Sequence, residues 1–133
     1  MKWRFFAWER ISRNGNDEYL YRLKIFQCPL FGIFLHWFIG SDDECKHDHP
    51  WSFVSIILYG GYWEEAPNGK LTWYPAGSIL RRMNPARCHR VVIDKPAMSL
   101  VIIGPKKRSW GFHTPLGWIH WLDYRYSEHC AGG

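Results

Sequence analysis

The sequence lacks a long uninterrupted apolar run. Its first segment, MKWRFFAWERISR, carries charges at Arg4, Glu9 and Arg10, which break up the apolar stretch that a signal peptide or a membrane span requires. We therefore expect a cytoplasmic protein that does not enter a membrane.

The sequence has few cysteines, and none of them forms a CxxC pair. The four cysteines are Cys28, Cys45, Cys88 and Cys130. In a reducing compartment such scattered cysteines are usually free thiols, so we expect no disulfide framework.

Long helical periodicity, low-complexity tracts and linkers are absent as well. A second hydrophobic core within 133 residues would leave each half near the size at which burial barely offsets chain entropy. We therefore expect residues 1–133 to form a single domain.

Aromatic residues, by contrast, are abundant, at 18% of the chain with nine Trp among them. Such rigid side chains bury a large area per residue. Short apolar or alternating segments recur between Gly, Pro and Asn residues, and we expect strands near residues 19–26, 31–38, 53–58, 61–65, 70–74, 79–83, 89–93, 99–103 and 109–113. This spacing predicts an all-β fold, a small antiparallel β-barrel or double-stranded jelly roll.

Basic residues outnumber acidic ones, and the formal net charge is +5 with neutral histidines. They gather in short clusters at 81–82, 87–90 and 106–108, which a nucleic-acid-binding protein would use on phosphates. Short basic runs are more often solvated surface, and no recognised nucleic-acid-binding motif accompanies them. A basic nucleic-acid-associated protein is therefore the least favoured alternative.

The segment KHDHPWSF, residues 46–53, places His47 and His49 one residue apart. On a strand, positions i and i+2 point to the same face, so both rings can contact one ion while Asp48 faces the other way. A third histidine, His89 in PARCHRVV, follows on a later predicted strand. Imidazole binds divalent Fe, Zn and Ni, so we expect His47, His49 and His89 to form one metal site.

Other side chains near these histidines are alternative metal ligands. Cys45 and Cys88 stand close to these histidines and would suit a mixed zinc site, although strand alternation turns Cys88 away from His89. Glu64 is a further ligand, a base or a rim charge. The other histidines, His36, His113, His120 and His129, have no partner at ligand spacing, and we expect them to serve in packing.

The histidine motifs resemble those of the cupin superfamily. Its first motif reads G(X)5HXH(X)3–4E(X)6G, and its second supplies a histidine after a Pro-containing turn. The matching residues are Gly40, His47, His49, Gly60 or Gly61, Pro85 and His89, with one extra residue before the histidine pair. The resemblance covers about residues 32–104 and implies the RmlC-like β-barrel.

The chain departs from the cupin pattern at the motif glutamate, because Phe53 or Val54 occupies that position. The resemblance then implies three neutral histidine ligands, similar to the sites of thiol dioxygenases and some ring-cleaving dioxygenases, with Fe(II) favoured and Zn or Ni as alternatives. Such a ligand set leaves the ion its full charge, which favours a small anionic substrate.

For that substrate we expect an inward arginine, Arg81 or Arg87, to hold a carboxylate, and Trp51 and Tyr62 to line the cavity. The alternative function is a non-catalytic cupin that binds a small ligand such as a sugar, since cupin barrels host many activities. Exposed edge strands also allow a homodimer.

Overall fold

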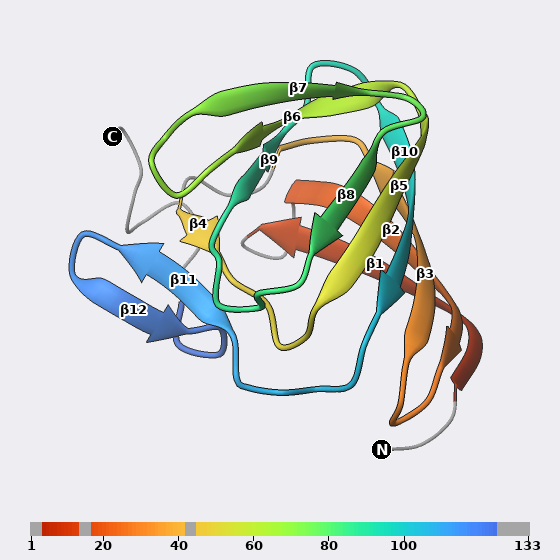
Figure 1. Cartoon of the computed structure of the whole chain (residues 1–133), viewed down its shortest axis with the longest axis horizontal. Coiled ribbons are helices and arrows are strands. Elements are labelled where there is room, and N and C mark those ends of the chain that lie inside the picture. Colours follow the sequence, from red (N-terminus) through yellow and green to blue (C-terminus); the bar gives the residue numbers. More distant parts are fainter. Residues whose placement is uncertain (1–3, 14–16, 42–44, 125–133) are drawn as a thin grey trace.

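The computed structural model of the protein describes residues 4–13, 17–41 and 45–124. Within these ranges the strands are β1 (Arg4–Arg13), β2 (Asp17–Gln27), β3 (Gly32–Phe38), β4 (Lys46–His47), β5 (Phe53–Tyr59), β6 (Gly61–Glu65), β7 (Leu71–Pro75), β8 (Ile79–Arg82), β9 (Arg90–Val92), β10 (Ala97–Ile103), β11 (Gly111–Thr114) and β12 (Gly117–His120). Figure 1 shows β6 and β7 at the top of the view and the hairpin of β11 and β12 at the lower left.

All strand pairs are antiparallel in the part of the chain that the structure describes. A six-stranded sheet has the order β1-β2-β3-β10-β5-β8, and two three-stranded sheets have the orders β7-β6-β9 and β12-β11-β4. An isolated antiparallel bridge between His47 and His89 joins the two small sheets. They form the second face of the fold, and the predicted all-β architecture is confirmed.

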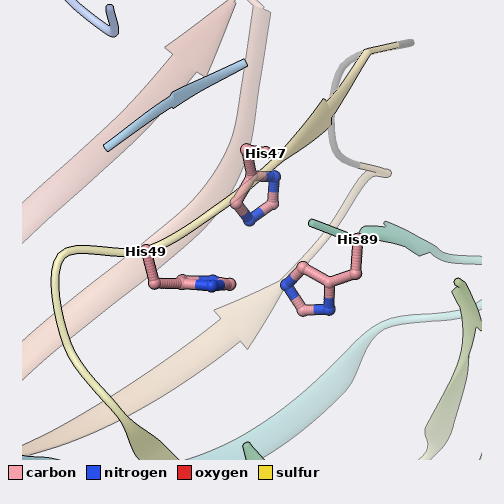
Figure 2. A group of neighbouring side chains, drawn as sticks. All are labelled: His47, His49 and His89. Atoms are coloured by element: carbon pink, nitrogen blue, oxygen red, sulfur yellow. The ribbon is translucent and has the colours of Figure 1, made fainter. Parts of the chain in front are cut away.

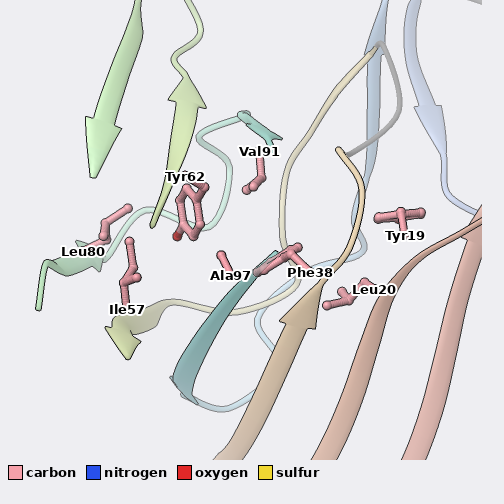
Figure 3. Packing of buried hydrophobic residues seen from close by; sticks show 8 residues of the cluster. All are labelled: Tyr19, Leu20, Phe38, Ile57, Tyr62, Leu80, Val91 and Ala97. Atoms are coloured by element: carbon pink, nitrogen blue, oxygen red, sulfur yellow. The ribbon is translucent and has the colours of Figure 1, made fainter. Parts of the chain in front are cut away.

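The core lies between the large sheet and this second face. Along β5 the buried residues alternate, with Phe53, Ser55 and Ile57 facing inward, because successive side chains of a strand point to opposite faces. The largest cluster joins both faces and consists of Tyr19, Leu20, Phe38, Ile57, Tyr62, Leu80, Val91 and Ala97 (Figure 3). Two further clusters include Phe34 and Phe112.

Gly60 turns the chain from β5 into β6. Its φ angle of 77° lies in the left-handed region, and a Cβ there would meet the Pro96 carbonyl oxygen at 2.5 Å. A side chain at this position would therefore clash as well as strain the backbone. The turn leads directly into β6, which carries Tyr62 and Glu64 toward the interior.

Every strand that the sequence pattern predicts is present, with ends shifted by at most two residues. The predicted strand segments leave out β1, β4 and β12, although the HXH spacing does place His47 of β4 on a strand. The charges of β1 interrupt its alternation, and β4 is only two residues long, so its pairing depends on distant partners. No helix long and apolar enough to cross a membrane occurs in the described residues.

Candidate metal centre

Three histidine rings meet between the two faces of the fold (Figure 2). His47 ends β4, His49 follows two residues later, and His89 immediately precedes β9. The ring centroids are 5.0 Å apart for His47 and His49, 4.9 Å for His47 and His89, and 4.8 Å for His49 and His89. One potential ligand nitrogen from each ring lies within 4.8 Å of the others, so a single ion can be reached by all three.

Backbone hydrogen bonds hold the histidines in place. His47 N donates to the His89 carbonyl and His89 N donates to the His47 carbonyl, both at 2.9 Å, and directly opposed residues present their side chains on the same face. The expectation that His49 shares a strand with His47 is wrong, because β4 ends at His47. Instead, His49 N donates to the Pro85 carbonyl at 2.9 Å, and its ring still faces the cavity.

Glu64 on β6 orients the ring of His89. Its Oε2 lies 2.8 Å from His89 Nδ1, and only 2% of Glu64 is exposed. With Nδ1 engaged, Nε2 is the nitrogen of His89 that remains available to an ion, and a carboxylate partner raises the basicity of such a ligand. Glu64 is therefore a buried positioning residue and not a rim charge.

Two arginines in turn hold the Glu64 carboxylate. Arg82 Nη2 donates to Oε1 at 2.7 Å and Arg87 Nη2 donates to the same oxygen at 3.3 Å. Burial alone would raise the pKa of Glu64, but the hydrogen bonds with His89 and Arg82 and the charge of Arg82 outweigh burial and lower this pKa to about 2. Glu64 is thus ionised at neutral pH.

Asp48, between two of the histidines in sequence, connects the site to the C-terminal hairpin. Its carboxylate accepts from Gly111 N at 2.8 Å and Trp118 Nε1 at 2.9 Å, and it lies 3.0 Å from both His113 Nε2 and Arg108 Nη1. Burial alone would raise the pKa of Asp48, but these donors lower it below its usual value. The predicted metal-binding segment is therefore anchored by a buried, ionised carboxylate.

The histidines open onto a cavity of about 510 Å³. Most of its wall is apolar and aromatic, with contributions from all three core clusters, including Phe34, Tyr62 and Phe112. Trp110 and Trp121, whose rings stack with centroids 5.8 Å apart, add to this wall from the C-terminal segment. The volume and lining suit a small molecule with an apolar body.

The residues expected to bind substrate fall in two places. Trp51 and Tyr62 line the cavity, whereas Arg81 and Arg87 do not. Arg81 is exposed on β8, because its neighbour Leu80 takes the inward position of the alternation. Arg87 contacts Glu64 and lines a separate outer hollow, so neither arginine meets the expectation of an inward carboxylate partner.

Phe53 lines the cavity next to the histidines, at one of the two positions where the cupin motif has its glutamate. Its ring centroid lies 4.7 Å from that of His49, and 9% of the residue is exposed. An apolar ring thus stands where the fourth protein ligand would be expected.

Among the polar residues of the cavity wall that sequence analysis missed are Arg22 on β2 and His36 on β3. They face each other across the strands, and Arg22 Nε donates to His36 Nε2 at 3.0 Å. Strand alternation could have identified Arg22, because it lies two residues after the inward-facing Leu20 of a predicted strand and therefore faces the same side.

Among the described residues, no cysteine takes part in the cluster of histidines. Cys88 lines the outer hollow while His89 faces the cavity, as strand alternation predicts. Cys28 and Cys88 are free thiols, but Cys45 is disulfide-bonded, so the expectation of a free thiol is wrong there. Cys130 and His129 lie outside the described residues.

The strand arrangement is similar to that of solved cupin structures. An RmlC-like cupin from Shewanella frigidimarina matches with a TM-score of 0.61 and 18% identity, over 77% of this chain and 86% of that chain. The polyketide cyclase RemF from Streptomyces resistomycificus matches with a TM-score of 0.65 and 14% identity, over 79% of this chain and 78% of that chain.

A third match is the Fe(II) form of HppE, with a TM-score of 0.61 and 13% identity, where 73% of this chain spans only 55% of that chain. No protein-family model and no curated protein sequence matches the chain. The fold is therefore that of the RmlC-like cupins, as the histidine motifs predict.

Proposed function

We propose that the protein is a metal-binding cupin in which His47, His49 and His89 hold one divalent ion and the adjoining cavity receives a small anionic molecule. The observation that carries this proposal is the convergence of three ring nitrogens within 4.8 Å at the wall of a cavity of about 510 Å³.

The donor set fits a divalent transition metal. Burial, together with the nearby His89, His47 and Arg22, lowers the pKa of His49 well below its usual value, so this imidazole is neutral and its lone pair is free for an ion. Three neutral nitrogens suit Fe(II), Zn or Ni, and Phe53 supplies no fourth protein ligand. Fe(II) is favoured because the solved structures similar in fold include the Fe(II) form of HppE. Bound there, Fe(II) would supply oxygenase-type redox chemistry, whereas Zn or Ni would supply Lewis-acid chemistry.

The chain's own residues prepare the site for an anion. Glu64 fixes the orientation of His89, and the aromatic walls exclude water from the ligand. In such a low-dielectric cavity each positive charge acts more strongly on a bound anion. A non-catalytic cupin that binds a neutral ligand such as a sugar is the second candidate, because the aromatic wall of Trp51 and Tyr62 would also accept a sugar face.

Nucleic acid is disfavoured because four arginines of the basic clusters are already paired with carboxylates. Arg82 and Arg87 bind Glu64, Arg90 binds Glu65, and Arg108 binds Asp48. Cations already paired with carboxylates are poor phosphate ligands. A homodimer stays a prediction, for which sedimentation is the test and the exposed edge strand β1 is the candidate surface.

Metal analysis of the protein purified without chelator tests the proposal. We expect about one equivalent of a divalent ion in the wild type and loss of stoichiometric metal in His47→Ala, His49→Ala and His89→Ala, since two imidazoles bind an ion weakly. His120→Ala, on the C-terminal hairpin away from the cavity lining, is the matched control and should keep full metal. Full occupancy in His89→Ala would show that the third ligand is misassigned.

Oxygen consumption then separates the two candidate functions. An Fe(II)-loaded oxygenase consumes O2 when its anionic substrate is added, whereas a binding cupin takes up its ligand without consuming O2. Small carboxylates and thiols are the first substrates to screen, because a site of three neutral ligands keeps a net positive charge.

A further inference from the structure

A row of polar side chains crosses the large sheet on the wall of the cavity. Glu9 on β1 lies opposite Arg22 on β2, Arg22 lies opposite His36 on β3, and His36 lies opposite Ser99 on β10. All four residues line the cavity. The row belongs to the large sheet, while His47 and His89 belong to the second face of the fold.

Arg22 is the residue of this row whose terminal amino groups remain available as hydrogen-bond donors. Its Nε donates to His36 Nε2 at 3.0 Å, and its guanidinium lies over the Phe34 ring, 5.1 Å from the centroid. Glu9, which faces it across the strands, forms its ion pair with Lys24 Nζ at 2.6 Å. No hydrogen bond or ion pair among the described residues joins the terminal amino groups of Arg22 to a carboxylate.

Two buried hydroxyl groups, that of Ser99 within this row and that of Ser55 on β5, lack hydrogen-bond partners in the described part of the chain. Ser55 is 2% exposed and Ser99 is 1% exposed, and the Oγ atom of each has no hydrogen-bond partner among the described residues. Both serines line the cavity. Buried polar groups are nearly always satisfied in native proteins, so hydroxyls left open toward a cavity indicate that a ligand or water completes them.

We propose that Arg22, held by His36, is the carboxylate-binding subsite of this cavity, and that Ser55 and Ser99 contribute hydrogen bonds to the same small organic anion. The inference deepens the proposed function and rests on it for the other end of the molecule, which would reach the three histidines.

The geometry supports a bidentate grip. The bond from Nε to His36 uses one edge of the guanidinium and leaves the terminal amino groups for the two oxygens of a carboxylate. His36 can accept this bond because burial and the nearby Arg22 charge lower its pKa well below the usual value and keep the ring neutral. Arg22 and the three histidines line the same cavity, so one small molecule can contact both.

The test is isothermal titration of benzoate and of its uncharged counterpart benzamide, whose aromatic ring suits the apolar wall. The proteins are wild type, Arg22→Met and, as a matched control that removes the same group outside the cavity, Arg81→Met. We expect benzoate to bind wild type and Arg81→Met alike, and at least tenfold more weakly to Arg22→Met. Benzamide should bind more weakly than benzoate and be unaffected by either change.

Each titration is run on metal-loaded and on chelator-treated protein, which separates this inference from the proposed function. If benzoate affinity depends on Arg22 in both preparations, and the protein retains no metal either as purified or after loading, the subsite is supported and the metal site is rejected. Benzoate binding that requires the metal and is equal in wild type and Arg22→Met would support the metal site and overturn the subsite. Absence of benzoate binding, or equal binding of benzamide, would also overturn it.

If Arg22→Met does not fold, as shown by the absence of a cooperative unfolding transition, Arg22→Lys replaces it in the test. Lysine keeps the positive charge but loses both the planar fork and the Nε bond to His36, so we expect benzoate affinity to fall relative to Arg81→Lys. Unchanged affinity in Arg22→Lys, with its metal content intact, would overturn the proposed bidentate grip.

Discussion

The carboxylate of Glu64 lies 2.8 Å from Nδ1 of His89 and accepts a hydrogen bond from Arg82 at 2.7 Å. One buried anion thus links a candidate metal ligand to a cation on the adjoining sheet. The link matters because an imidazole ring that is free to rotate presents its lone pair in the wrong direction for part of the time.

Replacing Glu64 by Gln should weaken metal binding without removing a ligand. The amide is similar in shape but carries no charge, so it holds the His89 ring less firmly and leaves Arg82 uncompensated. We expect a decrease in metal affinity of about tenfold to a hundredfold, measured by competition with a chromophoric chelator. Glu65→Gln, which breaks the ion pairs to Arg90 and Lys46 instead, is the matched control and should leave the affinity unchanged. Equal losses in both variants would contradict the positioning role.

Replacing Asp48 by Asn should destabilise the fold. The buried carboxylate receives hydrogen bonds or ion pairs from four groups, and loss of its charge leaves Arg108 without compensation. We expect the free energy of unfolding, measured by urea titration of the chelator-treated protein, to fall by about 2–4 kcal/mol. Asp94→Asn removes an exposed carboxylate that accepts one bond from Trp63 Nε1, and it should cost less than about 1 kcal/mol. If the two variants lost similar stability, Asp48 would not be the anchor of the hairpin.

The sequence predicts the histidine cluster through two short motifs, the HXH pair and the histidine after Pro85. The strand geometry assumed for the pair holds only for His47, because β4 ends there, whereas alternation correctly assigns Cys88 to the outside and His89 to the cavity. The strand segments follow from the same alternation and from the Gly and Pro turns between them.

The partners of these residues depend on strand register, which the sequence does not reveal. Glu64 reaches His89 because β6 pairs with β9, with Glu64 opposite Val91, and 25 residues separate the two side chains in sequence. Arg22 faces the cavity because β2 pairs with β3 in a register that includes an irregularity between Lys24 and Phe26. Closeness in sequence to a histidine therefore favours Arg87 as the cavity arginine, but Arg87 contacts Glu64 and lines the outer hollow instead.

Stability should depend on pH through His36. Burial and Arg22 hold the pKa of this ring well below 6.5 in the folded protein, so the unfolded chain binds a proton that the folded protein does not. The contribution of His36 is therefore complete above pH 6.5 and is lost as the pH falls below it, by up to about 1.4 kcal/mol per pH unit. His36→Gln keeps an acceptor for Arg22 but does not titrate. We expect urea unfolding of the chelator-treated proteins between about pH 6.5 and 5 to show a shallower loss of stability in this variant, and parallel curves would contradict the assignment.

Restoring the glutamate of the cupin motif should couple folding to metal binding. Phe53 is buried with its ring beside His49, so Phe53→Glu places a carboxylate near the three histidines and removes an aromatic ring from the core. Without metal, we expect the free energy of unfolding to fall by about 3 kcal/mol or more, from lost packing and a buried charge without a partner. Added Zn(II) would give that charge a partner, and it should raise the midpoint of thermal unfolding more in this variant than in wild type. Phe53→Gln is the matched control, because it loses the same ring and has nearly the same shape but offers a neutral oxygen that is a poorer ligand. Equal Zn(II)-induced shifts in Phe53→Glu and Phe53→Gln would show that position 53 does not point at the ion, and that the open place in the ligand set lies elsewhere.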